Sequence, residues 1–247
     1  MNKPSFLWPI LSFAALIAIW QVAALIAASP TLPGPSETFH AMREEIEFGY
    51  FSHLLATLAR VAAAFLIAMA VGSAIGVWLG MNAAADRFFG GWVILFLNLP
   101  ALVTIILCYV WFGLTEAAAV TAVAVNKIPN VAATVREGAK ALSTDLAEMA
   151  QVYRLSWSAK MRHVVLPQLA PFFAAAARNG LALVWKIVLV VELLGRPNGV
   201  GFKIHEHFQL FNVAAILAYA IGFIIVVQII EWTILQPWER AANRWRR

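Results

Sequence analysis

The chain has 247 residues, of which 62% are hydrophobic and 13% charged, with a single cysteine, Cys108, so an intramolecular disulfide is excluded. An ordinary soluble domain has about a quarter charged residues, so this composition excludes a typical water-soluble globular protein and indicates that lipid is the main solvent. The net charge of +5 does not indicate nucleic-acid binding, because the basic residues stand between and after apolar runs, with no aromatic-interleaved basic patch.

Six apolar runs are long enough to cross a membrane, which takes about 20 helical residues. They are Trp8–Ala28, Val61–Met81, Phe88–Phe112, Ala117–Val135, Phe172–Leu194 and Val213–Ile230. The first run is longer than the apolar part of a typical signal peptide, and further runs follow it, so we interpret it as a membrane helix that is retained. The sequence therefore predicts an all-α integral membrane protein with about six transmembrane helices.

The sequence predicts the structure of two connections between these runs. After the first run, residues 29–36 contain three prolines, which forbid a continuous helix, and a short polar helix is expected over His40–Phe48. The second run begins between Leu54 and Val61. Only residues 113–116 separate the third and fourth runs, which is enough for a tight turn.

Small residues recur every four positions in the second run. They are Ala64, Ala68, Gly72, Gly76 and Gly80. This spacing places them on one helix face, where small side chains let helix backbones approach closely in lipid. The pattern predicts a packing face directed at a neighbouring helix, either in this chain or in a second copy.

Lysine and arginine are unevenly divided between the two sides of the membrane. With a cytoplasmic amino terminus and six crossings, eleven fall inside: Lys3, Arg87, Arg136, Lys140, Arg154, Lys160, Arg162, Arg240, Arg244, Arg246 and Arg247. Three fall outside: Arg43, Arg196 and Lys203. Cytoplasmic loops are richer in basic residues, so both termini are expected to be cytoplasmic.

The longest hydrophilic connection, about residues 136–161, joins the fourth and fifth runs. Apolar residues at helical spacing, including Leu146, Met149 and Tyr153, predict a short amphipathic helix within it. Leu166-Pro167 and Pro171 are expected to break the chain before the fifth run. A helix held along the membrane surface suits the docking of a soluble partner.

This segment resembles the EAA loop of ABC importer permeases. That loop contains Glu-Ala-Ala, three residues, Gly, nine residues, Ile, one residue and Leu-Pro. Five residues stand at matching positions: Glu148, Ala150, Val164, Leu166 and Pro167. Arg154 stands where the family has the glycine that separates two short helices, so the resemblance does not establish a bend at this position. Arg154 and nearby Ser156 are expected to contact the ATPase.

Other short motifs resemble the nitrate/sulfonate/taurine branch of that family. They include Thr57–Val61, Leu99–Ala101, Trp111–Gly113, Arg178–Leu181 and Glu192–Gly195. The resemblance implies a first transmembrane helix and outer loop in residues 1–50, a permease domain in 51–236 with its coupling loop at 145–167, and a basic cytoplasmic tail in 237–247. It also implies a location in the bacterial inner membrane.

The resemblance further implies the partners. Two permease copies pair, two ATPase subunits dock on the EAA loops, and a periplasmic binding protein delivers the solute. The chain has no Walker-type glycine-rich loop, so we expect it to hold no cofactor, with ATP and Mg bound by the ATPase. The expected solute is a small anion such as nitrate, a sulfonate, taurine or an organic acid.

Several polar residues inside the runs are candidates for the translocation pathway. They are Asn126, Lys127, Trp185, Lys186 and Glu192. A charge at the centre of a membrane helix costs about 2.5–3.5 kcal/mol on insertion scales, so it should face protein or water. Lys127 and Lys186 either line a path for an anion, snorkel to the surface, or pair with Glu192 or Glu231.

A metal site is not expected at His205-Glu206-His207, because residues two apart do not share a helix face. A polar outer loop with turns at Gly195, Gly199 and Gly201 is the alternative. For the whole protein, two other functions remain open: a self-contained secondary transporter, which should show an internal repeat, and a non-transporting membrane scaffold.

Overall fold

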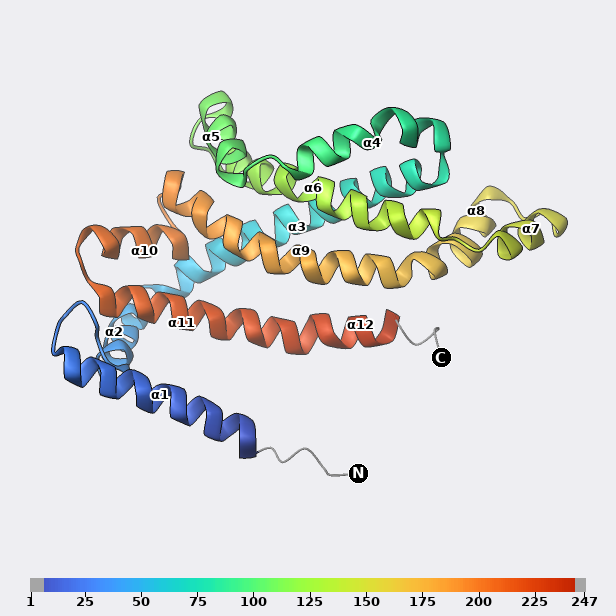
Figure 1. Ribbon diagram of the computed structural model, residues 1–247. Coiled ribbons are helices and arrows are strands. Elements are labelled where there is room, and N and C mark those ends of the chain that lie inside the picture. Colours follow the sequence, from blue (N-terminus) through green and yellow to red (C-terminus); the bar gives the residue numbers. More distant parts are fainter. Residues whose placement is uncertain (1–6, 243–247) are drawn as a thin grey trace.

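The computed structural model describes residues 7–242, and the regular structure among them is helical (Figure 1). The first half contains α1 (Leu7–Ala27), α2 (Pro35–Glu47), α3 (Tyr50–Met81), α4 (Ala83–Leu97), α5 (Ala101–Phe112) and α6 (Glu116–Lys140). The second half contains α7 (Thr144–Val152), α8 (Trp157–Lys160), η1 (Met161–Val165), α9 (Leu166–Gly195), α10 (Val200–Gln209), α11 (Val213–Ile230), η2 (Glu231–Leu235) and α12 (Gln236–Ala242), where η marks a π-helical turn.

Five helical stretches are long and apolar enough to cross a membrane, and the bent pair α4–α5 makes up to six. The five are Ile10–Ala27, Tyr50–Met81, Glu116–Lys140, Trp157–Gly195 and Val213–Trp238. The predicted all-helical membrane architecture is therefore confirmed. Lys3, Arg244, Arg246 and Arg247, which entered the prediction of sidedness, lie outside the described residues.

The sequence suggested that the third apolar run forms one continuous helix. The structure shows that it does not. It divides into α4 and α5, which are bent by 94° at the break. Pro100 has no N–H to continue a helix, and its ring disfavours a helical conformation at Leu99, so the first helix stops before it and a new helix starts after it.

The expected break at Pro167 and Pro171 is wrong. Residues Trp157–Gly195 form one helical stretch that includes both prolines. The stretch widens at η1, where the Leu166 N–H donates to the Met161 carbonyl five residues earlier. Pro167 follows this wider turn and has no N–H to donate to the carbonyl four residues earlier. The hydrogen bond that proline removes therefore falls where the α-helical hydrogen-bond pattern is already interrupted.

Helices α3, α6 and α9 form the centre of the bundle, with α11 beside them (Figure 1). One end of the bundle carries α2 and α10, where α3 and α6 begin and α9 ends; we call it the α10 end. At the opposite end, the α7 end, α7 and α8 project beyond the other helices. Helix α1 packs mainly on α2 and leaves most of its apolar surface exposed.

The small-residue face of α3 lies against α6 of the same chain. A Cβ atom built on Gly72 would stand 2.7 Å from Val131 Cβ, and one on Gly76 would stand 2.7 Å from the Ala132 carbonyl oxygen. A Cβ on Gly80 would likewise collide with Ala139. The partner helix that the sequence left open is therefore α6.

Two polar connections also differ in detail from the prediction. Helix α2 begins at Pro35, earlier than the expected His40, because Pro35 stands in its first turn and Glu37 Oε2 accepts a hydrogen bond of 3.0 Å from the Gly34 N–H. The expected outer loop around His205 is instead the helix α10, which follows a turn at Gly199 with φ of 115°.

Candidate functional site

The projecting helix α7 is closed at both ends by local hydrogen bonds. Ser143 Oγ accepts from the Leu146 N–H at 3.3 Å, which caps the amino terminus. At the other end, the Arg154 N–H donates to the Gln151 carbonyl at 3.0 Å and the Leu155 N–H donates to the Ala150 carbonyl at 2.9 Å. These two bonds form a Schellman motif, the usual way to end a helix before a change of direction.

Arg154 stands at the position of that motif where glycine is usual. Its φ is 50°, in the left-handed region that L-residues other than glycine rarely occupy. The bend that the family glycine provides is therefore present here with arginine. The Arg154 side chain is exposed.

The α7–α8 segment is attached to α9 by a buried contact surface and by one glutamine. Ala150 and Val164 are buried, at 2% and 6% exposure. Gln168 Oε1 accepts a hydrogen bond from the Ser143 N–H at 2.9 Å, and its amide donates to the Val164 carbonyl at 2.8 Å. These contacts join α7 to the start of α9.

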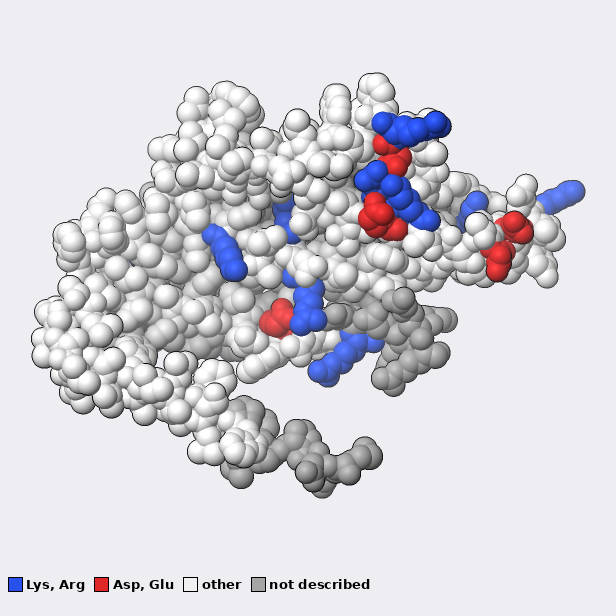
Figure 2. Space-filling model, in the orientation of Figure 1, with Lys and Arg blue, Asp and Glu red and all other residues white. Residues whose placement is uncertain are grey.

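The outer face of the segment combines charge with exposed apolar side chains. Glu148 and Ser156 of the segment are exposed, as are Leu166 and Pro167 at the start of α9. So are large apolar residues, at 40–79% exposure: Leu146, Met149, Val152, Tyr153 and Trp157. A projecting surface of this composition is typical of a protein–protein contact. On the face viewed in Figure 2, most charged side chains lie toward this α7 end.

An ion cluster near the α7 end joins α4 to α6. The Arg136 guanidinium donates to the Asp86 carboxylate, and Lys140 Nζ lies 2.8 Å from Asp86 Oδ2. Both basic residues also lie 3.7 Å from a carboxylate oxygen of Glu137. This cluster fixes the start of α4 beside the end of α6.

The two lysines within the spans occupy different environments. Lys186 is exposed on α9, and no hydrogen bond or ion pair joins it to another described residue. Lys127 is 1% exposed, lies over Gly180 of α9, and donates to Asn130 Oδ1 at 2.8 Å. Neither pairs with Glu192, which binds Arg60, or with Glu231, which lies 3.5 Å from Arg178.

The other pathway candidates lie mostly inside this chain. Trp185 is buried edge-on against Phe223, Asn126 is half-buried on α6, and Glu192 is fully buried. Among the five candidates, Lys186 alone presents its side chain on an open surface of the single chain.

A polar cluster around the buried Arg60 and Glu192, at the α10 end, was not anticipated as a unit. Arg60 on α3 pairs with Glu192 on α9 at 2.6 Å and with Glu116 on α6 at 2.7 Å. The sequence contained a signal, because a buried arginine and a buried glutamate each require a partner. Arg196 joins the cluster through Glu116 at 2.6 Å.

The His205-Glu206-His207 segment belongs to α10 and makes protein contacts. His207 Nε2 lies 3.1 Å from Glu45 Oε1 on α2, and Lys203 Nζ lies 2.6 Å from Glu206 Oε2. The hydrogen bond from Lys203 lowers the pKa of Glu206. Within residues 7–242, no group of three or more His, Cys, Asp or Glu side chains is placed to hold a metal ion.

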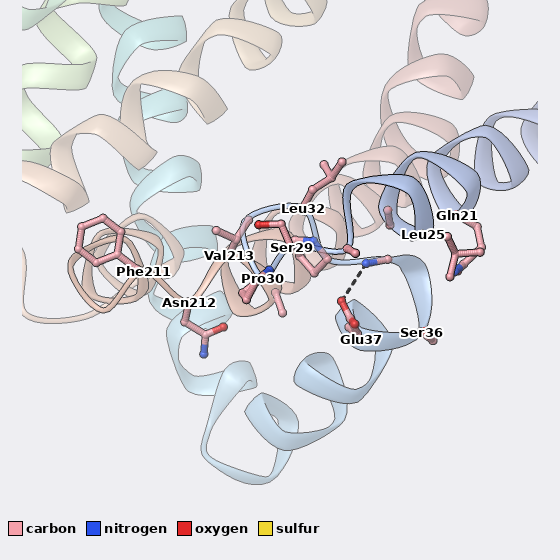
Figure 3. Close-up of a pocket in the computed structure, with 15 residues that line it drawn as sticks. Gln21, Leu25, Ser29, Pro30, Leu32, Ser36, Glu37, Phe211, Asn212 and Val213 are labelled. Atoms are coloured by element: carbon pink, nitrogen blue, oxygen red, sulfur yellow. Dashed lines mark hydrogen bonds between the residues drawn. The ribbon is translucent and has the colours of Figure 1, made fainter.

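A cleft lies at the α10 end, between the end of α1, the following loop and the start of α11 (Figure 3). Its volume is about 640 Å³ and its lining includes Gln21, Glu37 and Asn212. No lysine or arginine lines it. It is therefore separate from the Lys186 surface and from the α7–α8 segment.

Residues 68–235 match the family described as binding-protein-dependent transport system inner membrane component. The chain belongs to this family. It is therefore a multi-pass inner-membrane permease subunit of an ABC importer, a transport subunit whose ATPase is a separate protein. Membership implies ATPase and binding-protein partners, and it decides against a self-contained secondary transporter and a non-transporting scaffold.

Curated relatives match along nearly their whole length. A putative aliphatic sulfonates transport permease of Bacillus subtilis is 27% identical, covering 94% of this chain and 85% of the relative. A bicarbonate transport system permease of Synechococcus elongatus is 25% identical, with 94% and 88% covered. A taurine transport system permease of Escherichia coli is 23% identical, with 95% and 88% covered.

Solved structures of ABC transporters share the fold. An inward-facing MetNI methionine ABC transporter structure matches with a TM-score of 0.71 at 20% identity, covering 81% of this chain and 99% of the matched chain. An amino acid ABC transporter crystallised with histidines matches with a TM-score of 0.63 at 21% identity, with 81% and 98% covered. The predicted type I importer permease fold is confirmed.

Proposed function

We propose that two copies of this permease pair along the exposed face of α9 and form a path for a small anionic solute. The observation that carries this proposal is Lys186, a cation about two-thirds of the way along the membrane helix α9 that is exposed and unpaired within the described chain. Facing lipid there costs about 2.5–3.5 kcal/mol on insertion scales. A second copy that enclosed this face around water would remove that cost.

The chemistry of the solute follows from the same lysine. In a symmetric pair, two Lys186 ammonium groups face one path and favour a negatively charged group between them. The relatives are named for aliphatic sulfonates, bicarbonate and taurine, each of which carries an anionic group. We infer a small anion of this kind, delivered by a periplasmic binding protein.

We further propose that the ATPase docks on the α7–α8 segment, with Glu148, Arg154 and Ser156 at the contact and Ala150, Val164, Leu166 and Pro167 supporting it. The segment projects from the bundle and is bonded to α9 through Gln168. The α7 end and both termini are then cytoplasmic, in agreement with the excess of basic residues assigned to that side. ATP and Mg bind to the ATPase, and this chain needs no cofactor.

Exchange of Lys186 tests the pathway assignment. The complex of permease, ATPase and binding protein is reconstituted in liposomes, and uptake of a labelled sulfonate or bicarbonate is measured for Lys186→Met and Lys186→Arg. A hydrogen bond to a charged group contributes about 1.5–3 kcal/mol, so the methionine variant should lose roughly 10- to 150-fold in apparent affinity. The arginine variant should retain most of it. Equal uptake by both variants would assign Lys186 to structure.

Exchange of Glu148 tests the docking assignment. Glu148→Lys should insert normally but lose ATPase binding and solute-stimulated ATP hydrolysis, because it reverses a charge on the proposed contact. Glu47→Lys is the control, since Glu47 is exposed on α2 at the opposite end. If the Glu148 variant copurifies with the ATPase and transports at the normal rate, the segment is not the docking site.

A further inference from the structure

Arg60 has a hydrogen-bond acceptor for every N–H of its guanidinium. Its Nε donates to Glu116 at 2.9 Å, and Nη1 donates to Glu192 at 2.6 Å and to the Asn198 carbonyl at 2.9 Å. Nη2 donates to Glu116 at 2.7 Å and also to the Asn198 side chain. A guanidinium has five N–H groups, so none is left unpaired, although the side chain is only 5% exposed.

Both carboxylate oxygens of Glu192 likewise accept hydrogen bonds, from donors on two other helices, α3 and α10. Its Oε1 accepts from Arg60, and its Oε2 accepts from Thr57 Oγ1 and from the Gly201 N–H, both at 2.9 Å. Thr57 in turn accepts from the Val200 N–H at 2.8 Å. We call Thr57, Arg60, Glu116, Glu192 and Asn198 the Arg60 clamp.

The connection from α9 to α10 is built closely around the Glu192 carboxylate. A Cβ atom on Gly199, whose φ is 115°, would collide with that carboxylate. A Cβ on Gly201 would stand 2.9 Å from Glu192 Cβ. The clamp therefore fixes α10 as well as the ends of the three central helices.

The clamp and the α7–α8 segment lie at opposite ends of the same helices. Between them, the small residues of α3 hold its backbone against α6, and Val131 and Val135 of α6 pack with Ala176 of α9. Helices α3, α6 and α9 are thus joined along their length by packing and at the α10 end by paired charges. A break in the clamp would leave their α10 ends held by apolar packing alone, which includes Val61 of α3, Ala119 of α6 and Val191 of α9.

We propose that Arg60 is a positioning residue for transport, which makes α3, α6, α9 and α10 move as one body. A displacement of α7–α8 then moves the α10 end of the same helices by a rigid-body motion, with no change in the distances between them. This inference rests on the proposed docking of the ATPase at α7–α8. Whether the helices move as one body is tested separately, by the distance between two of them. Lysine cannot replace Arg60, because an ammonium has three donors at one point instead of five in a planar fork.

A distance measurement within one chain tests the single-body motion. Spin labels are placed on exposed Leu55 of α3 and Leu194 of α9, in a background where Cys108 is alanine, and labelled chains are diluted with unlabelled ones in the assembled complex. The distance by electron paramagnetic resonance should be the same, and narrowly distributed, without nucleotide and with ATP bound by a hydrolysis-deficient ATPase. A distance that differs between the two states overturns the proposal.

A neutral double variant tests the role of Arg60 in transport. Arg60→Gln with Glu192→Gln removes both buried charges while keeping groups that hydrogen-bond. We expect assembly and ATP hydrolysis to persist, solute transported per ATP to fall at least tenfold, and the spin-label distance to broaden. Arg43→Gln, an exposed arginine of α2, is the control and should change none of these.

The ratio of transport to hydrolysis separates positioning from a general structural role. A fall in both rates by the same factor, with an unchanged distance distribution, overturns the proposal. If the double variant does not assemble, a distance that changes between the two states in the native sequence still overturns the proposal. Failure of the docking proposal would appear differently, as α7–α8 variants that keep normal ATPase contact and ATP hydrolysis, whatever the spin-label distance in the native sequence.

Discussion

Arg154 holds a backbone conformation that suits glycine better. The left-handed region costs an L-residue about 1–2 kcal/mol, and the Schellman bonds of α7 keep Arg154 there. The sequence located this position but could not show whether the bend survives arginine. Two backbone hydrogen bonds and the buried Ala150 together outweigh the local cost.

We predict that Arg154→Gly stabilises this turn by about 1 kcal/mol, because glycine adopts positive φ without the Cβ penalty. Hydrogen–deuterium exchange of residues 150–156 should slow by roughly fivefold. Arg154→Ala should not slow it, since alanine retains the Cβ atom. Faster exchange in the glycine variant would show that the arginine side chain itself stabilises the turn.

The partners of single charged residues were only partly predictable. Glu192 follows Lys186 by six positions, which places the two on different faces of one helix, so their pairing was unfavourable from the start. The actual partner, Arg60, is 132 positions away. Its proximity depends on how α3 and α9 cross, which no local pattern in the sequence records.

At the scale of single elements, hydropathy located the membrane runs but not their breaks. Pro100 and Pro167 look alike in the sequence, yet α4–α5 bends by 94° while α8–η1–α9 continues. At Pro167 the π-helical turn absorbs the missing donor, and Val164, Val165 and Leu169 are buried, which keeps the helix on the bundle. The choice between a break and a bulge is made by tertiary packing.

The packing of α3 on α6 supplies a prediction at this scale. Gly76→Leu should force the two backbones apart, because even its Cβ would stand 2.7 Å from the Ala132 carbonyl oxygen. Overpacking of this kind costs about 1–3 kcal/mol or more. The unfolding temperature of the purified protein in detergent should fall by several degrees, and expression in the membrane should decrease.

Ala74→Leu is the matched control for that variant, since Ala74 lies on the exposed side of the same helix. Its unfolding temperature should remain close to that of the native protein. An equal decrease in both variants would show that the α3–α6 contact is not the sensitive feature.

At the scale of the whole molecule, composition and the periodicity of the runs were sufficient for the fold class, since a chain with so few charges must satisfy its backbone inside lipid. Composition and periodicity do not predict which exposed helix faces meet lipid and which meet a second copy. A stripe of exposed residues runs along α9 past Lys186, including Ala182, Leu183 and Val190. Exposure in one chain does not distinguish lipid from a second copy.

Cross-linking between copies separates those two environments. In a Cys108→Ala background, Val190→Cys on α9 should give a covalent dimer with a short bis-maleimide, because it lies one helical turn from Lys186 on the stripe proposed to face the partner. Leu66→Cys, 64% exposed on α3, should stay monomeric in the same membranes. Strong cross-linking at Leu66 with none at Val190 would place the second copy against α3, and the α9 stripe with its lysine would then face lipid.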